Sequence, residues 1–279
     1  MTELPMHIQK SIQNYQDITV DGIILHPVLV GEYDEFLLAR PALEVLHQSL
    51  PVALLRVPLL SALYQMDYEA RLNGKPVTGL FFRALIGLSL SLRLGAGEEL
   101  EERVKRFNVI VERDNPARLV GLRYKDNDGE EREIKPSAYK ELRQIIAAQN
   151  GVKLESDRAD PELVKAEKDL AEMNGISLDA SIDELIHSIA AISGVDESDI
   201  YQWPILKLHK RQQSYQRILN FLICGIGQVS GTTWKGGNPH PSPFFDKLDE
   251  GGFGAHMALS DFAGGAGERA VANAGQQVN

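Results

Sequence analysis

The sequence GLFFRALIGLSLSLRL, residues 79–94, decides the fold because it is one of the two longest apolar stretches of the chain. Its apolar residues surround a helix instead of following one face, which is typical of a helix buried at the centre of a domain. Arg83 and two serines interrupt it, and it is too short to span a bilayer, which needs about 20 apolar residues. We therefore expect a central, buried helix that ends at Gly95.

The residues before this helix predict a hairpin and amphipathic helices. Residues 17–30 are rich in β-branched side chains and contain the turn pair Asp21-Gly22, so we expect a short strand or a hairpin. An acidic cluster then predicts the first turn of a helix, which Pro41 either kinks or divides into two. Apolar residues at helical spacing predict another helix over residues 57–72.

The hydrophobic period changes after the central helix. Residues 107–112, 119–124 and 130–134 alternate apolar and polar side chains, which predicts a small antiparallel meander. The turn DNDG, residues 126–129, has the composition of a calcium loop. An EF-hand, however, needs a glutamate six residues after its glycine, and Lys135 stands there. We therefore predict a hairpin turn and no metal site.

These patterns predict an α+β fold: an N-terminal domain of helices with a small antiparallel sheet, then a mostly α-helical C-terminal domain and a flexible tail. We place the α+β domain at residues 1–155. Residues 156–250 form the predicted helical domain with an aromatic, proline-rich arm, and its helix-start signals include Asp160 and the capping box that begins at Ser181. Residues 251–279 are rich in glycine and alanine, so we expect a disordered tail.

Composition argues against several partners and compartments. The formal net charge of −10 repels phosphate backbones, so we expect no nucleic acid partner. Cys224 is the sole cysteine, which excludes an internal disulfide and fits a reducing compartment, the cytoplasm. The N-terminal residues lack the apolar core of a signal peptide, and we expect no membrane association.

Catalytic motifs are missing from the sequence. It contains no GxSxG elbow, P-loop, HExxH pair or complete dinucleotide fingerprint. The seven histidines are scattered, and no two have the spacing of metal ligands on one helix face. We therefore predict no catalytic residue, no cofactor and no metal, and a protein that is not an enzyme.

The strongest amphipathic pattern lies near the C-terminal end. A seam with alternating steps of three and four predicts a long helix that packs either inside its domain or against a partner. The seam residues are Ile205, Leu208, Gln212, Tyr215, Leu219, Leu222 and Ile226.

A segment rich in aromatic residues, proline and glycine follows at residues 230–246, which we call the arm. Proline favours an extended chain, and aromatic side chains are common anchors at protein interfaces. The arm therefore either binds a partner or packs back on its own domain. The residues that we predict to contact a partner are Tyr201, Trp203, Tyr215, Trp234, Pro239, Phe244 and Phe245.

Four motifs in this region occur in a distinctive order: IYQW at 200–203, ICGIGQVSG at 223–231, WKGGNP at 234–239 and PFFD at 243–246. With earlier segments that agree, they cover most of residues 18–246. In this pattern the chain resembles a family of proteins encoded in the tail modules of phages and prophages of Gram-positive bacteria.

The resemblance implies a tail assembly chaperone, which binds the tape-measure protein and helps tail-tube subunits polymerise around it in the host bacterial cytoplasm. It brings no catalytic residues. The ending from Gly251 departs from the family pattern, which indicates either a lineage-specific tail or a translational frameshift. A homo-oligomer, a structural tail or neck component of the virion, and an enzyme with an unrecognised site remain as alternatives.

Overall fold

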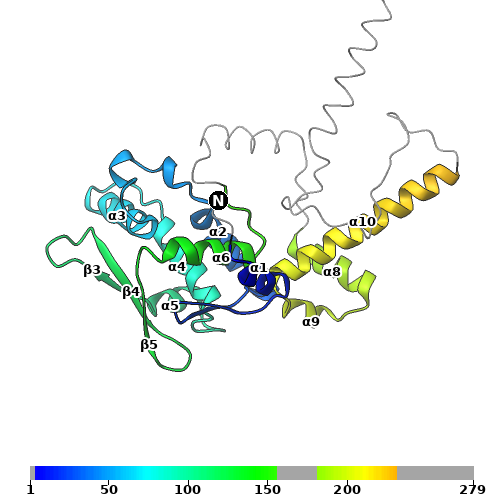
Figure 1. Ribbon diagram of the computed structural model, residues 1–279, viewed down its shortest axis with the longest axis horizontal. Helices are drawn as coiled ribbons and strands as arrows, with labels where there is room; N and C mark the ends of the chain where they lie inside the picture. The colour runs from blue at the N-terminus through cyan, green and yellow to red at the C-terminus, as the bar shows by residue number, and fades with distance from the viewer. Residues whose placement is uncertain (1–3, 156–180, 231–279) are drawn as a thin grey trace, which may run out of the picture. The chain divides into compact units, whose positions relative to one another are not determined.

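The central helix predicted from residues 79–94 is α4 (Leu80–Ser91), and it is buried as expected (Figure 1). The structure is a computed structural model and describes residues 4–155 and 181–230. Helix α2 (Tyr33–Glu44) crosses α4 so closely that a Cβ atom on Gly87 would lie 3.4 Å from the Cβ of Ala39. Pro41 lies inside α2, so the helix continues through it.

Helix α3 (Leu59–Leu72) supplies the cap for α4. The N–H groups of Gly79 and Phe81 donate to the Asp67 carboxylate, each at 3.1 Å, and the Thr78 hydroxyl donates to it at 2.6 Å. Asp67 is only 3% exposed. Since the first N–H groups of a helix have no partner within the helix, this carboxylate takes the place of a local N-cap.

The predicted hairpin is formed by β1 (Ile18–Val20) and β2 (Ile23–Leu25). Asp21 and Gly22 both have positive φ, 48° and 79°, as a two-residue turn that matches the twist of the strands requires. Helix α1 (Met6–Gln13), which the sequence did not predict, precedes the hairpin.

The predicted meander is also confirmed. Strands β3 (Asn108–Val111), β4 (Leu119–Lys125) and β5 (Glu131–Ile134) are antiparallel in that order, and Leu122 pairs with both Val109 and Ile134. Helix α5 (Leu100–Lys105) precedes the meander. A short 3₁₀ turn, η1 (Val30–Glu32), lies between β2 and α2, and two more, η2 (His47–Ser49) and η3 (Val52–Leu54), lie between α2 and α3.

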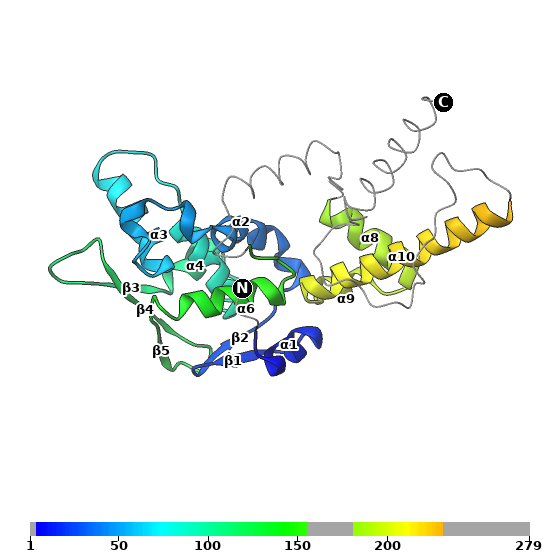
Figure 2. The same ribbon diagram turned by 45° about the horizontal axis from the view of Figure 1, so that its top comes forward.

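Helix α6 (Tyr139–Gln149) follows the meander and contacts both β2 and α3 (Figure 2). Its Arg143 guanidinium donates to the carbonyls of Leu43 and Val45, at 2.5 and 2.7 Å, at the C-terminal end of α2. At the end of α6, Asn150 accepts the N–H of Val28 at 2.9 Å. These long-range bonds tie α6 to α2 and to the segment after the hairpin.

The second described segment is helical: α8 (Ile182–Ser193), α9 (Glu197–Tyr201) and α10 (Ile205–Val229). The predicted capping box is present, with Ser181 and Glu184 each accepting the other's backbone N–H at 3.2 Å. The fold is therefore mixed α+β, as predicted. The helix expected after Asp160 and the tail from Gly251 lie outside the described residues, and the predicted domain boundaries stay predictions.

Candidate protein-binding site

Two segments far apart in the sequence pair at the start of α10. Residues 28–30 and 203–205 meet in a short antiparallel bridge. The N–H of Val30 donates to the carbonyl of Trp203 at 2.8 Å. The N–H of Ile205 donates to the carbonyl of Val28 at 3.0 Å. The bridge fixes the first turn of α10 to the segment that leads into α2.

Each side of this bridge places one buried side chain in the other's core. Ile205 belongs to the large core of residues 8–154. Val30 belongs to a smaller core, where it packs with Ile186, Ile189, Ile200 and Leu208. The two cores therefore exchange one aliphatic residue each across the bridge.

Gly31 allows this close approach. A Cβ atom at this position would lie 3.4 Å from the carbonyl oxygen of Tyr201 and 3.9 Å from its side chain. An alanine methyl group fits at these distances, but a branched side chain would collide with the backbone of α9.

The first half of the predicted seam is covered by its own chain. Ile205 and Leu208 are 1% and 0% exposed, and Tyr215 packs against the smaller core. Helix α8 contacts α10 on this side. The intramolecular alternative for the seam is therefore correct for its first half.

One aromatic ring lies near each of three basic residues in this half. The Lys207 ammonium lies 4.1 Å from the centroid of a Trp203 ring, and Lys210 lies 5.5 Å from the Tyr15 ring. The His209 ring centroid lies 6.2 Å from that of Tyr33. Burial lowers the pKa of His209 to about 4, although a hydrogen bond with Gln212 opposes the shift, and the nearby charge of Arg40 lowers it further.

The second half of the seam is exposed. Leu219 and Leu222 are each 50% exposed and Ile226 is 68% exposed. Val229, three residues beyond the end of the predicted seam, is 91% exposed. Ile218 and Ile223 flank these positions and are exposed as well. Figure 1 draws this half as the yellow-to-orange end of α10. We call these six residues the exposed stripe.

No charged residue occurs within the exposed stripe. Residues 218–229 contain no Asp, Glu, Lys or Arg, and Asn220 and Cys224 lie on the opposite side of the helix. Across all of α10 the sequence has four cations and no anion. The cations stand before the stripe, so apolar contact alone is available along its length.

Three of the predicted partner-binding residues lie just before α10 or in its first half. The Tyr201 hydroxyl donates a hydrogen bond to Asp183 at 3.3 Å. The Trp203 carbonyl accepts the N–H of Val30 in the bridge, and Tyr215 packs against the smaller core. These contacts are within the chain. The other four predicted residues, Trp234, Pro239, Phe244 and Phe245, lie outside the described residues. Val30 and Gly31 pack against the residues around the start of α10, and nothing in the sequence near them predicts these contacts.

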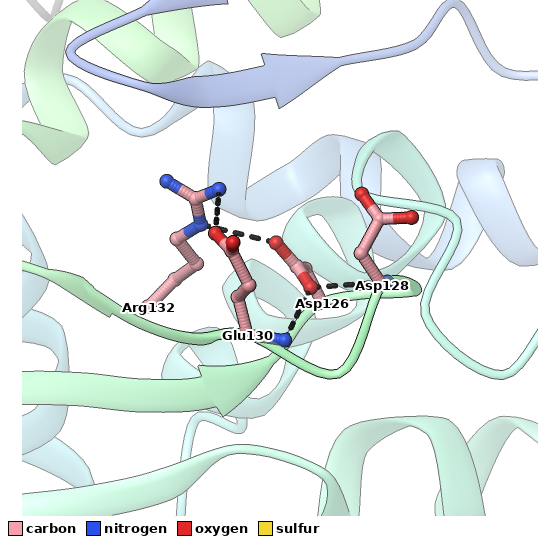
Figure 3. A network of polar contacts seen from close by, with 4 residues as sticks. All are labelled: Asp126, Asp128, Glu130 and Arg132. Atoms are coloured by element: carbon pink, nitrogen blue, oxygen red, sulfur yellow. Dashed lines mark hydrogen bonds and ion pairs between the residues drawn. The ribbon is translucent and has the colours of Figure 1, made fainter.

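The acidic turn before β5 is explained by its own hydrogen bonds (Figure 3). The Asp126 carboxylate accepts the N–H groups of Asp128 and Glu130 at 3.1 and 2.8 Å, and Arg132 donates to it at 3.0 Å. Burial raises the pKa of Asp126, but these donors outweigh burial and lower it overall. The carboxylate thus orders the turn of the predicted hairpin, which joins β4 and β5.

Within residues 4–155 and 181–230, no group of three or more His, Cys, Asp or Glu side chains could hold a metal ion. No helix in the same residues is long and apolar enough to cross a membrane. Comparisons of the chain with models of protein families, with curated proteins and with solved structures find no match.

Proposed function

We propose that this chain is a non-enzymatic assembly chaperone or adaptor of a phage tail, which binds a tape-measure or tail-tube protein through the second half of α10. The observation that carries the proposal is the exposed stripe, because it continues a seam whose first half already packs against a helix. The resemblance to proteins of phage tail modules gives the class of partner.

The stripe has the spacing of a helix-binding surface. Leu219, Leu222, Ile226 and Val229 alternate steps of three and four, which is the a/d pattern of a coiled coil. An amphipathic partner helix laid along it would bury all four. Covering the exposed half of one leucine contributes about 1 kcal/mol. A contiguous exposed patch of this kind marks interaction surfaces in many proteins.

The proposal predicts capture of the full chain by the tape-measure protein encoded in the same tail module. Leu222→Glu and Ile226→Glu should each weaken capture at least tenfold, because a carboxylate would be buried against the partner helix. Asn220→Glu, on the opposite side of the same helix, is the matched control and should leave capture unchanged. Binding would be measured by co-purification and by titration of the purified proteins.

The contribution of the arm is tested separately with the double variant Trp234→Ala and Phe244→Ala. Loss of capture in that variant would add the arm to the binding surface, and unchanged capture would remove it.

Mass spectrometry of purified phage particles addresses the alternative class. A stoichiometric amount of the chain in particles would make it a structural tail or neck component instead of a chaperone.

A further inference from the structure

We propose that in the free chain the exposed stripe is covered by the stripe of a second copy, with the two α10 helices antiparallel. This inference goes beyond the proposed function, since it concerns the chain before any tail protein binds. The observation behind it is the exposed fraction of the seam side chains. This fraction is 0–1% at Ile205 and Leu208 and 50% or more at Leu219, Leu222 and Ile226.

The stripe is complementary to itself when two copies run in opposite directions. In antiparallel coiled coils an a residue of one helix packs against a d residue of the other. Leu219 then faces Val229 of the second copy, and Leu222 faces its Ile226. The two-fold axis repeats both layers, so four successive layers contain only Leu, Ile and Val. Ile218 and Ile223 border these layers and extend the apolar contact.

Charge is compatible with this arrangement. Residues 218–229 carry no charge, so the overlap of two copies places no like charges together. Arg217 directly precedes the stripe, but it lies seven residues before Cys224 and therefore on the same side of the helix as Cys224, away from the second copy.

The covered first half of the seam argues against a parallel pair. Helix α8 and the bridge at residues 28–30 occupy that half. Parallel helices in register would bring both copies of these elements to the same end of the pair. Antiparallel helices place them at opposite ends, where only the stripes overlap.

The size of the overlap predicts a reversible dimer. Residues 219–229 cover about 15 Å of helix at about 1.5 Å per residue. Two helices in contact over this length fall at or below the ~1,200–2,000 Å² that specific, stable interfaces bury. We therefore expect a dimer that dissociates on dilution, and that a tail protein could replace.

Sedimentation of the full chain over a range of concentrations tests the stoichiometry. The mass should approach that of two chains at high concentration and of one chain on dilution. Leu222→Glu and Ile226→Glu should each remain at the mass of one chain, whereas Asn220→Glu should behave as the unmodified protein. A single-chain mass at every concentration would overturn the proposal, and so would equal loss of dimer in the Asn220→Glu variant.

Cross-linking tests the direction of the helices. Cys224→Ser removes the native thiol, and single cysteines are then introduced at chosen stripe positions. A Leu219→Cys chain should form disulfides when mixed with a Val229→Cys chain and should not with itself. An Ile223→Cys chain lies near the two-fold axis and should cross-link with itself. Disulfides between two Leu219→Cys chains would establish a parallel pair and reject the antiparallel arrangement.

These outcomes are independent of partner capture. A chain that is monomeric but still captured by the tape-measure protein would end the dimer inference and leave the proposed function standing. A dimeric chain that captures no tail protein would do the opposite.

Discussion

Asp67 stabilises the start of α4 from a different helix. Its carboxylate accepts three hydrogen bonds while almost fully buried, and two of these come from backbone N–H groups at the helix terminus. A charged acceptor is favourable there because the helix N-terminus carries partial positive charge. The sequence gives no sign of this role, since Asp67 lies in the interior of α3, twelve positions before Gly79.

Asp67→Ala should lower the free energy of unfolding by about 2–3 kcal/mol, because it leaves buried donors without an acceptor. Urea unfolding of the full chain measures this change. Glu69→Ala is the matched control, since Glu69 is an exposed residue of the same helix that bonds Gln65, and its loss should cost about 0.5 kcal/mol or less. Equal losses in the two variants would show that the cap adds nothing.

His209 gives the packing of α10 a pH dependence. Its folded-state pKa of about 4 lies below the ordinary value of 6.5, so the unfolded chain binds a proton first as pH falls. The stability due to neutral His209 is complete above about pH 6.5 and is lost between that pH and about 4.

The expected loss on going from pH 7.5 to pH 4.5 is of order 2 kcal/mol. His209→Gln should reduce the pH dependence of thermal unfolding by about that amount. His187→Gln is the control, because His187 is exposed and Glu197 raises its pKa, which stabilises the folded state at low pH. An unchanged pH profile in the His209→Gln variant would contradict the assignment.

At the scale of elements, periodicity in the sequence was a good guide to the described helices and strands. The hairpin, the meander, α4 and the capping box of α8 all follow from local patterns. Helix α1 was missed because its sequence is short and largely polar. Local patterns describe which side of an element is apolar, and that is the information these predictions used.

The candidate site shows where such reasoning stops. The seam of α10 was predicted as a single continuous feature, yet one half is buried and the other exposed. Which half is covered depends on where α8 and the bridge at residues 28–30 lie in space. Those contacts join positions far apart in the chain, and periodicity carries no information about them.

At the scale of the whole molecule, the bridge at the start of α10 joins the two cores, and Gly31 lies beside it against Tyr201. Gly31→Val should weaken the bridge by about 1–3 kcal/mol, because its branched side chain would collide with Tyr201. Gly31→Ala is the control, since its methyl group meets ordinary contact distances.

Hydrogen exchange measures the weakening of the bridge separately for each region of the chain. In the Gly31→Val variant, amides of α8 and α9 should exchange faster while those of α4 keep their protection. Val30 is one of five buried residues in the smaller core, whereas Ile205 is one of many in the larger core. Uniform loss of protection across both regions would mean that the two cores unfold as a single unit.

The exchange of Val30 and Ile205 between the cores also has a consequence during synthesis. A ribosome adds about 5–20 residues per second, so on the order of ten seconds or more separates the appearance of Val28 from that of Ile205. Throughout that interval the nascent N-terminal region lacks one of its core side chains, and the backbone of residues 28–30 has no strand to pair with. The larger core can thus be completed only after translation has passed α9.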